Sequence, residues 1–378
     1  IAILAVLTAG VVGTRLWRGG EDAAPRMSML VADTVNRTGD AAFDETVVEL
    51  LSTSLEQSRS LAIYPRTRVA HVLRLMRRDA ETPIDAAVGR EILQREGLGA
   101  LVSSTVSRLG DAYVLLVTVE DASGGALASS RQVFDRPGEL PSRIDLAVQE
   151  VRAGLGESAP SIQANAVPLA DVTSGSLEAV RLYTRARQRL HAGDAEAAMA
   201  LLRSALELDP DFAMAHEYLG VAYTNLQDPA RAEQHMTRAV ALVDRVPAAE
   251  RHKILGDYHM LTRNYDEACA QLQMLVELRP LDPTPLMSLG WCRGLKYDFA
   301  GGAADTRRAL DMQPTARGRV NLARLLFLGG DPQAGLDLAD EVRREQPANM
   351  QAQFVAAQSA LGLRRLDDAA RSYEAMIA

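Results

Sequence analysis

The sequence predicts a small mixed-sheet α/β domain over residues 27–155, a linker over residues 156–175, and an all-α solenoid over residues 176–378. Short apolar segments separated by turn residues predict the strands and helices of the first part. A pattern of small residues that recurs along the second part predicts stacked helix pairs. The composition, with 47% hydrophobic but only 4% aromatic residues, favours helices packed through small side chains.

The first residues of the chain form an apolar run. Residues 1–13 carry no charge, and Arg15 and Arg18 follow. A helix over this run would reach about 20 Å, which is shorter than the hydrocarbon core of about 30 Å. We therefore expect residues 1–17 to be the remnant of a transmembrane helix, with the apolar core of a signal peptide as the alternative.

The α/β part begins with an apolar strand, followed by a turn at residues 36–40. The next segment has Val47, Leu51 and Leu55 on one helical face. A turn at Gly110-Asp111 predicts a hairpin further along. The expected order is strand 27–34, helix 43–57, strand 61–69 interrupted by Pro65, helices 69–76 and 83–97, strands 100–109, 112–121 and 126–134, and a helix over 139–155.

From residue 176 onward, a small residue is followed by a second one twelve positions later, and this pair recurs. The first members of successive pairs are spaced 34, 36, 34, 33 and 34 residues apart. A helix pair repeated at about 34 residues is a tetratricopeptide repeat, so we expect about six repeats, the last incomplete. The residues expected at the helix contacts are Ala186, Ala198, Gly220, Ala232, Gly256, Ala268, Gly290, Gly302, Ala323 and Ala357.

Superhelices of this repeat family bind partners with the inner face of each first helix. Counting from the small residues gives the side chains expected on that face, and aromatic residues and arginines there make good anchors. These candidate partner-binding residues are Tyr183, Arg187, Glu217, Tyr218, Lys253, Asp257, Met287, Trp291, Arg324 and Phe327. The alternative is that some of them pack between repeats.

No catalytic motif stands out in the chain. We find no glycine-rich phosphate loop with its lysine, no His-Arg-Asp loop, no Asp-Phe-Gly site and no Walker motif. No two histidines have zinc-helix spacing. Cys269 and Cys292 are expected to be free and buried, and the alternative is an oxidised pair outside the cytoplasm. We therefore expect neither a cofactor nor a metal in this chain, and the net charge of −8 argues against a nucleic-acid partner.

Two stretches resemble a known module. "VADTVNRTGDAAFDETVVELLSTSLEQSRSLAIYPRTRV" resembles the opening of a module related to the amino-terminal domain of TolB, and "VSRLGDAYVLLVTVEDASGGAL" resembles its closing hairpin. The order of spanning helix, TolB-like unit, linker and repeats resembles the extracytoplasmic half of a bacterial eukaryotic-like serine/threonine protein kinase. Winged-helix transcription regulators and nucleotide cyclases carry a similar tail.

These features predict a membrane-anchored sensing and protein-interaction region of a bacterial signalling protein. The resemblance implies a single-pass protein of the inner (cytoplasmic) membrane, with residues 27–378 outside the cytoplasm and a kinase domain elsewhere in the full-length protein. The expected partners are a protein or peptide in the repeat groove and the membrane at the N-terminal helix. The alternatives are a secreted or periplasmic repeat adaptor, and the sensor tail of a winged-helix regulator or cyclase.

Overall fold

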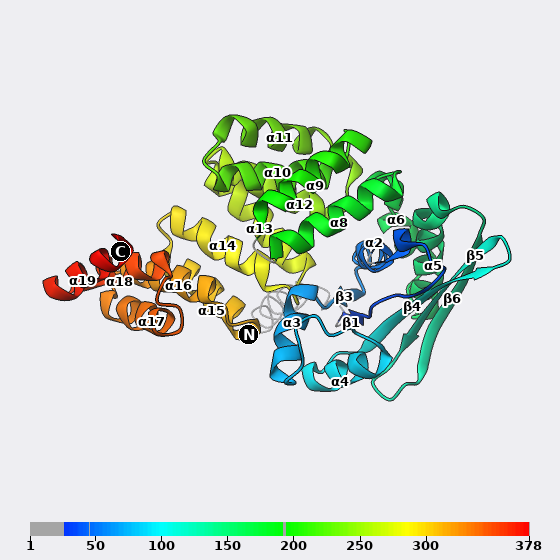
Figure 1. Cartoon of the computed structure of the whole chain (residues 1–378), viewed down its shortest axis with the longest axis horizontal. Helices are drawn as coiled ribbons and strands as arrows, with labels where there is room; N and C mark the ends of the chain where they lie inside the picture. The colour runs from blue at the N-terminus through cyan, green and yellow to red at the C-terminus, as the bar shows by residue number, and fades with distance from the viewer. Residues whose placement is uncertain (1–25, 45, 192–193, 378) are drawn as a thin grey trace, which may run out of the picture.

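The computed structural model of the chain describes residues 26–44, 46–191 and 194–377. The transmembrane remnant expected at residues 1–17 lies outside these residues. Within them, no helix combines the length and the apolar character needed to cross a bilayer. The described chain comprises a mixed-sheet α/β unit and a helical solenoid that curves beside it (Figure 1).

The α/β unit is built on a six-stranded sheet in the order β3-β1-β4-β5-β6, with β2 paired to β4. The first strand is parallel to both of its neighbours, whereas β4, β5 and β6 form an antiparallel meander. The mixed sheet expected from the sequence is therefore confirmed. The strands are β1 (Met27–Val31), β2 (Val35–Arg37), β3 (Leu61–Ile63), β4 (Ala100–Leu109), β5 (Ala112–Glu120) and β6 (Ala126–Phe134).

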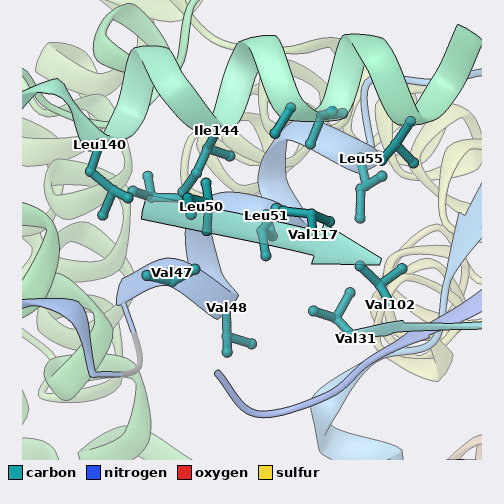
Figure 2. Packing of buried hydrophobic residues seen from close by; sticks show 14 of the residues in the cluster. Val31, Val47, Val48, Leu50, Leu51, Leu55, Val102, Val117, Leu140 and Ile144 are labelled. Atoms are coloured by element: carbon teal, nitrogen blue, oxygen red, sulfur yellow. The ribbon is translucent and has the colours of Figure 1, made fainter. Parts of the chain in front are cut away.

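Helices cover both faces of this sheet. Alternate residues of β1 point to opposite faces, as the pleat requires, so Met29 joins one core cluster and Leu30 the other. The cluster that contains Met29 is closed by α2 (Thr46–Leu55) and α5 (Leu140–Gly154), and Figure 2 shows their side chains meeting those of the sheet. The cluster that contains Leu30 is closed by α3 (Arg66–Leu75) and α4 (Ala86–Glu96).

Several element boundaries differ from the sequence expectation. The strand expected over residues 61–69 ends at Ile63, because Pro65 precedes the first turn of α3, where a missing backbone N–H is tolerated. A short 3-10 helix, η1 (Ala41–Phe43), separates the early turn from α2. The helix expected from residue 83 begins after Asp85, whose carboxylate accepts bonds from the first backbone N–H groups. Gly97 ends this helix in the left-handed region, as expected.

The segment expected to be a linker, residues 156–175, contains two short helices, α6 (Ala159–Asn165) and α7 (Leu169–Val172). Leu169 is fully buried in the core that α2 and α5 share. The Gln57 side chain also exchanges two hydrogen bonds with the backbone of Val167, at 2.8 and 2.9 Å. This segment therefore packs against the α/β unit rather than extending away from it.

The described residues from 177 to 377 form six helix pairs, as the repeat period predicts. A recurring turn joins the two helices of a pair: a residue with positive φ, such as Gln227 or Gly330, precedes the cap of the second helix. The cap is often an aspartate whose carboxylate accepts a backbone N–H bond, as Asp228 and Asp331 do. The helices are α8 (Leu177–His191), α9 (Ala195–Leu208), α10 (Ala213–Asn225), α11 (Pro229–Ala241), α12 (Ala248–Leu261), α13 (Tyr265–Leu278), α14 (Pro283–Leu295), α15 (Phe299–Met312), α16 (Ala316–Leu328), α17 (Pro332–Glu345), α18 (Met350–Gly362) and α19 (Leu366–Ile377).

The small residues of the repeat pattern lie where paired helices approach most closely. A methyl group on Gly220 would lie 2.4 Å from Cγ of Met236 in the next helix. One on Gly302 would lie 2.6 Å from the backbone oxygen of Gly290. The alanines of the pattern, from Ala186 to Ala357, are fully buried.

The expectation of free cysteines is wrong. Cys269 of α13 and Cys292 of α14 form a disulfide with a Cα–Cα distance of 5.7 Å. The spacing of the two cysteines in the sequence does not reveal the disulfide, because they belong to different repeats. They meet only when the second helix of one repeat stacks on the first helix of the following repeat. The disulfide therefore links two neighbouring repeats.

Replacing Gly220 by leucine should destabilise the solenoid. The new side chain would overlap Met236, and overpacking of this kind costs about 1–3 kcal/mol. Thermal unfolding of the full chain, followed by circular dichroism, measures the loss. Gly138→Leu is the matched control, since nothing lies within 4 Å of a methyl group at that position. Equal midpoints for the two variants would contradict the close contact.

Reducing the Cys269–Cys292 disulfide should also lower stability. The two cysteines are 23 residues apart, and the chain-entropy relation for a loop of this length gives about 3 kcal/mol. Urea unfolding with and without a reductant measures the change. The double variant Cys269→Ser/Cys292→Ser should not respond to the reductant, and a wild type that responds no more than this variant would contradict the role of the bond.

Candidate functional site

The first helices of the repeats line the concave side of the solenoid, and helix α2 of the α/β unit packs against this side at α8 (Figure 1). The apolar face of α2 is buried in the α/β core, so its polar face points toward the solenoid. Glu49 lies on that polar face, and Glu56 follows the last residue of the helix on the same side. Glu49 pairs with Arg187 of α8, and Glu56 accepts a bond of 2.7 Å from Arg279, which follows α13.

A second set of contacts joins the α/β unit to the middle of the solenoid. Arg26 donates a hydrogen bond of 3.0 Å to the backbone oxygen of Leu278. Gln313, at the end of α15, donates one of 3.1 Å to the backbone oxygen of Thr67. Leu281 packs against the core between α3 and α4. The α/β unit therefore touches the solenoid at both α8 and the α13–α15 region.

A cavity of about 600 Å³ remains between these two areas of contact. Its walls come from α2, β3, α3 and the loop at residues 80–84 on one side, and from α8, α10 and α12 on the other. Four of the predicted partner-binding residues lie in its wall: Tyr183, Arg187, Tyr218 and Lys253. These four residues share one surface, as the sequence predicts, but the α/β unit lies across that surface.

The charges around the cavity are paired unevenly. The Arg279 guanidinium binds both Glu56 and Glu250, so one positive charge serves two carboxylates. Burial raises the pKa of Glu56, and the nearby Glu250 and Glu49 raise it further, while Arg279 opposes them. Lys253 likewise lies between Glu217 and Asp257, with its Nζ 4.8 Å from the centroid of the Tyr218 ring.

Glu217 has no exposed surface, and it lies behind Lys253 rather than in the cavity wall. Burial raises its pKa to about 7, although Lys253 partly offsets the shift. The two carboxylates beside Lys253 raise the pKa of that ammonium. Within the described chain, no hydrogen-bond donor reaches Oε2 of Glu217, so the ionised carboxylate is stabilised at only one of its two oxygens.

The other four predicted residues lie in the second half of the solenoid, outside the cavity wall. The guanidinium carbon of Arg324 lies 5.6 Å from the centroid of the Trp291 ring, so α16 and α14 present a cation over an aromatic face. No carboxylate of the described residues pairs with Arg324. Met287 contacts Gly318 of the next repeat, so it packs between repeats. Phe327 lies against Gly335 of its own repeat and Gly362 of the next one.

Sequence reasoning missed the residues that join the two units, namely Glu49, Glu56, Glu250 and Arg279. Charged residues on the polar face of an amphipathic helix are ordinarily solvated, and this pattern alone does not reveal a partner. The only available signal was their spacing, since Glu49 and Glu56 are two helical turns apart and so share one face.

Comparisons with known proteins support the repeat assignment. A tetratricopeptide repeat family model matches residues 183–244 and 321–378. The tetratricopeptide repeat-containing protein trd-1 of Caenorhabditis elegans is 27% identical over 122 residues, which are 32% of this chain and 15% of that protein. The chain thus spans a small part of that relative's length.

Two solved structures are similar to about half of this chain. TTC0263, a thermophilic tetratricopeptide repeat protein of Thermus thermophilus, is 18% identical with a TM-score of 0.41, covering 48% of this chain and 99% of that one. PilW, a type IV pilus biogenesis factor, is 17% identical with a TM-score of 0.42, and the match covers 51% of this chain and 90% of PilW. The family match shows that the helical region carries tetratricopeptide repeats, a type of module that generally binds peptides or proteins.

Replacing Glu217 by glutamine should change how stability depends on pH. The pKa of Glu217 is about 7 in the folded chain and about 4.3 in an unfolded one. The folded state therefore holds an extra proton between these values, and the stability that Glu217 contributes is present below about pH 4 and is lost as pH rises through about 7. Glutamine cannot ionise, so this loss should disappear.

Urea unfolding of both proteins at several pH values measures the effect. The free energy of unfolding of the glutamine variant, relative to the wild type, should increase between about pH 5 and pH 8. Glu207→Gln, at an exposed position on α9, is the control and should show a constant difference. A constant difference for Glu217→Gln as well would contradict the raised pKa.

Proposed function

We propose that this chain is the sensing and protein-interaction region of a bacterial signalling protein, and that a partner binds the second half of the concave face. The observation that carries the proposal is the Trp291–Arg324 pair on α14 and α16. Burial lowers the pKa of Arg324, and no carboxylate of the described chain neutralises it. An apolar side chain stacked on Trp291, with a carboxylate beside Arg324, would satisfy both groups.

The resemblance of residues 31–69 and 106–127 to a TolB-related module supports a place beside a kinase domain in the full-length protein. Such modules occur just outside the membrane in bacterial signalling proteins, which places residues 27–378 outside the cytoplasm in our proposal. The disulfide between Cys269 and Cys292 supports this location, since disulfides persist in oxidising compartments. The phosphoryl transfer would then belong to a domain outside this chain.

Truncation of Trp291 to alanine should weaken partner binding by more than about 2 kcal/mol, which is roughly a 30-fold loss of affinity. Partners captured with the full chain would be purified and their affinities measured by calorimetry. Tyr297→Ala, in the turn between α14 and α15, is the control, because this tyrosine is 82% exposed and should contribute little. A folded Trp291→Ala variant with full affinity would rule out this groove.

The membrane anchor can be tested by fractionation. Residues 1–20, joined to their natural upstream sequence, should keep the protein in the membrane fraction after high-salt and carbonate washing. A spanning helix remains in the bilayer under these conditions, because its apolar residues would otherwise face water. Release of a shortened chain into the soluble fraction would instead support the secreted or periplasmic adaptor.

A further inference from the structure

The cavity between α2 and the concave face has the size of a small-molecule site. Its volume of about 600 Å³ lies within the range of about 300–1,000 Å³ that is usual for ligand pockets. Both structural units contribute to its walls, so a molecule bound there would contact the α/β unit and the solenoid together. The lining therefore indicates which chemical class of ligand this junction can hold.

The lining carries an excess of negative charge, with seven acidic and four basic residues. Each basic residue already has a carboxylate partner, so an anionic ligand would find no free cation. These pairs are Arg66 with Asp33, Arg187 with Glu49, Lys253 with Glu217 and Asp257, and Arg279 with Glu56 and Glu250.

The excess of negative charge is clearest around Arg279. Glu56 and Glu250 share this single guanidinium, so the three groups together keep one negative charge when both carboxylates are ionised. Both bonds that Arg279 donates to Glu56 end on the same oxygen, Oε2, at 2.7 and 3.1 Å. No donor of the described residues reaches Oε1, and the Glu56 side chain is 26% exposed in the cavity wall. This oxygen can therefore accept a bond from a ligand.

Part of the wall is apolar, between the charged and hydroxyl-bearing residues that also line the cavity. Val48 of α2, Ile63 of β3, Val69 of α3 and Met214 of α10 all line the cavity. A carbon chain that packs on these side chains would leave water, which favours a ligand with an aliphatic part. A complementary molecule has a carbon chain that covers these side chains and a positive group that reaches Glu56.

We propose that this cavity binds an aliphatic amine, with its ammonium group bonded to Glu56 beside Glu250 and its carbon chain against the apolar wall. The proposal rests on the sensing role proposed above and gives that role a ligand class. Since both units form the site, the bound amine would stabilise the packing of α2 on the solenoid by mass action.

Calorimetric titration of the full chain with hexylamine, hexanoate and hexanol tests the charge preference at constant chain length. Hexylamine should give saturable binding with one site per chain, while hexanoate should give none and hexanol should bind at least tenfold more weakly. Binding of hexanoate as tight as that of hexylamine, or no saturable binding of hexylamine, would overturn the proposal.

Two variants locate the site. Glu56→Gln keeps the size of the side chain and should weaken hexylamine binding roughly tenfold or more, because a bond to a charged group becomes one to a neutral amide. Ser52→Met leaves every carboxylate in place and adds volume to the cavity wall, so it should also weaken binding. Glu207→Gln is the control for charge, and unfolding midpoints without ligand show whether each variant remains folded.

The outcomes separate this inference from the partner groove. Trp291→Ala should bind hexylamine like the wild type, because Trp291 is not part of the cavity wall. Unchanged hexylamine affinity in both Glu56→Gln and Ser52→Met would show that the amine binds elsewhere. Loss of amine binding in Trp291→Ala would place it in the groove and contradict the cavity site.

Discussion

The packing of α2 between the sheet and the solenoid is the contact on which the arrangement of the two units depends. One face of this helix buries Leu50 and Leu51 in the α/β core, and the opposite face carries Glu49 and Glu56 toward the concave side. A helix can present both faces because its side chains repeat every 3.6 residues. The sheet therefore fixes where the two carboxylates lie, and these determine where the solenoid can attach.

The ion pairs of α2 set geometry more than stability. The free-energy cost of removing two charges from water offsets most of the attraction between them, so a buried ion pair contributes little net stability. Glu49 and Glu56 are seven residues apart, which is about 10 Å along the helix axis. Their partners, Arg187 and Arg279, belong to different parts of the solenoid. Two pairs at this separation fix the direction of α2 as well as its position.

This arrangement divides the concave face into two surfaces with different access. The first three repeats face the α/β unit across the cavity, so Tyr183 and Tyr218 are reached through it. The Trp291–Arg324 pair is not part of the cavity wall, and no carboxylate of the described chain forms an ion pair with Arg324. The two proposed sites use different residues of the solenoid, so a ligand in the cavity would not occupy the surface at Trp291.

The sequence by itself determined the repeat, because close packing of paired helices requires a small residue, such as Gly220 or Ala232, at every period. It also determined the hairpin of β4 and β5, since Gly110 marks a tight turn between alternating strands. Only the tertiary structure decided the contacts between units, such as Glu56 with Arg279. Glu56 and Arg279 are 223 positions apart in the sequence, so no local pattern relates them. They meet because the curvature of the stacked repeats brings Arg279 back beside the α/β unit.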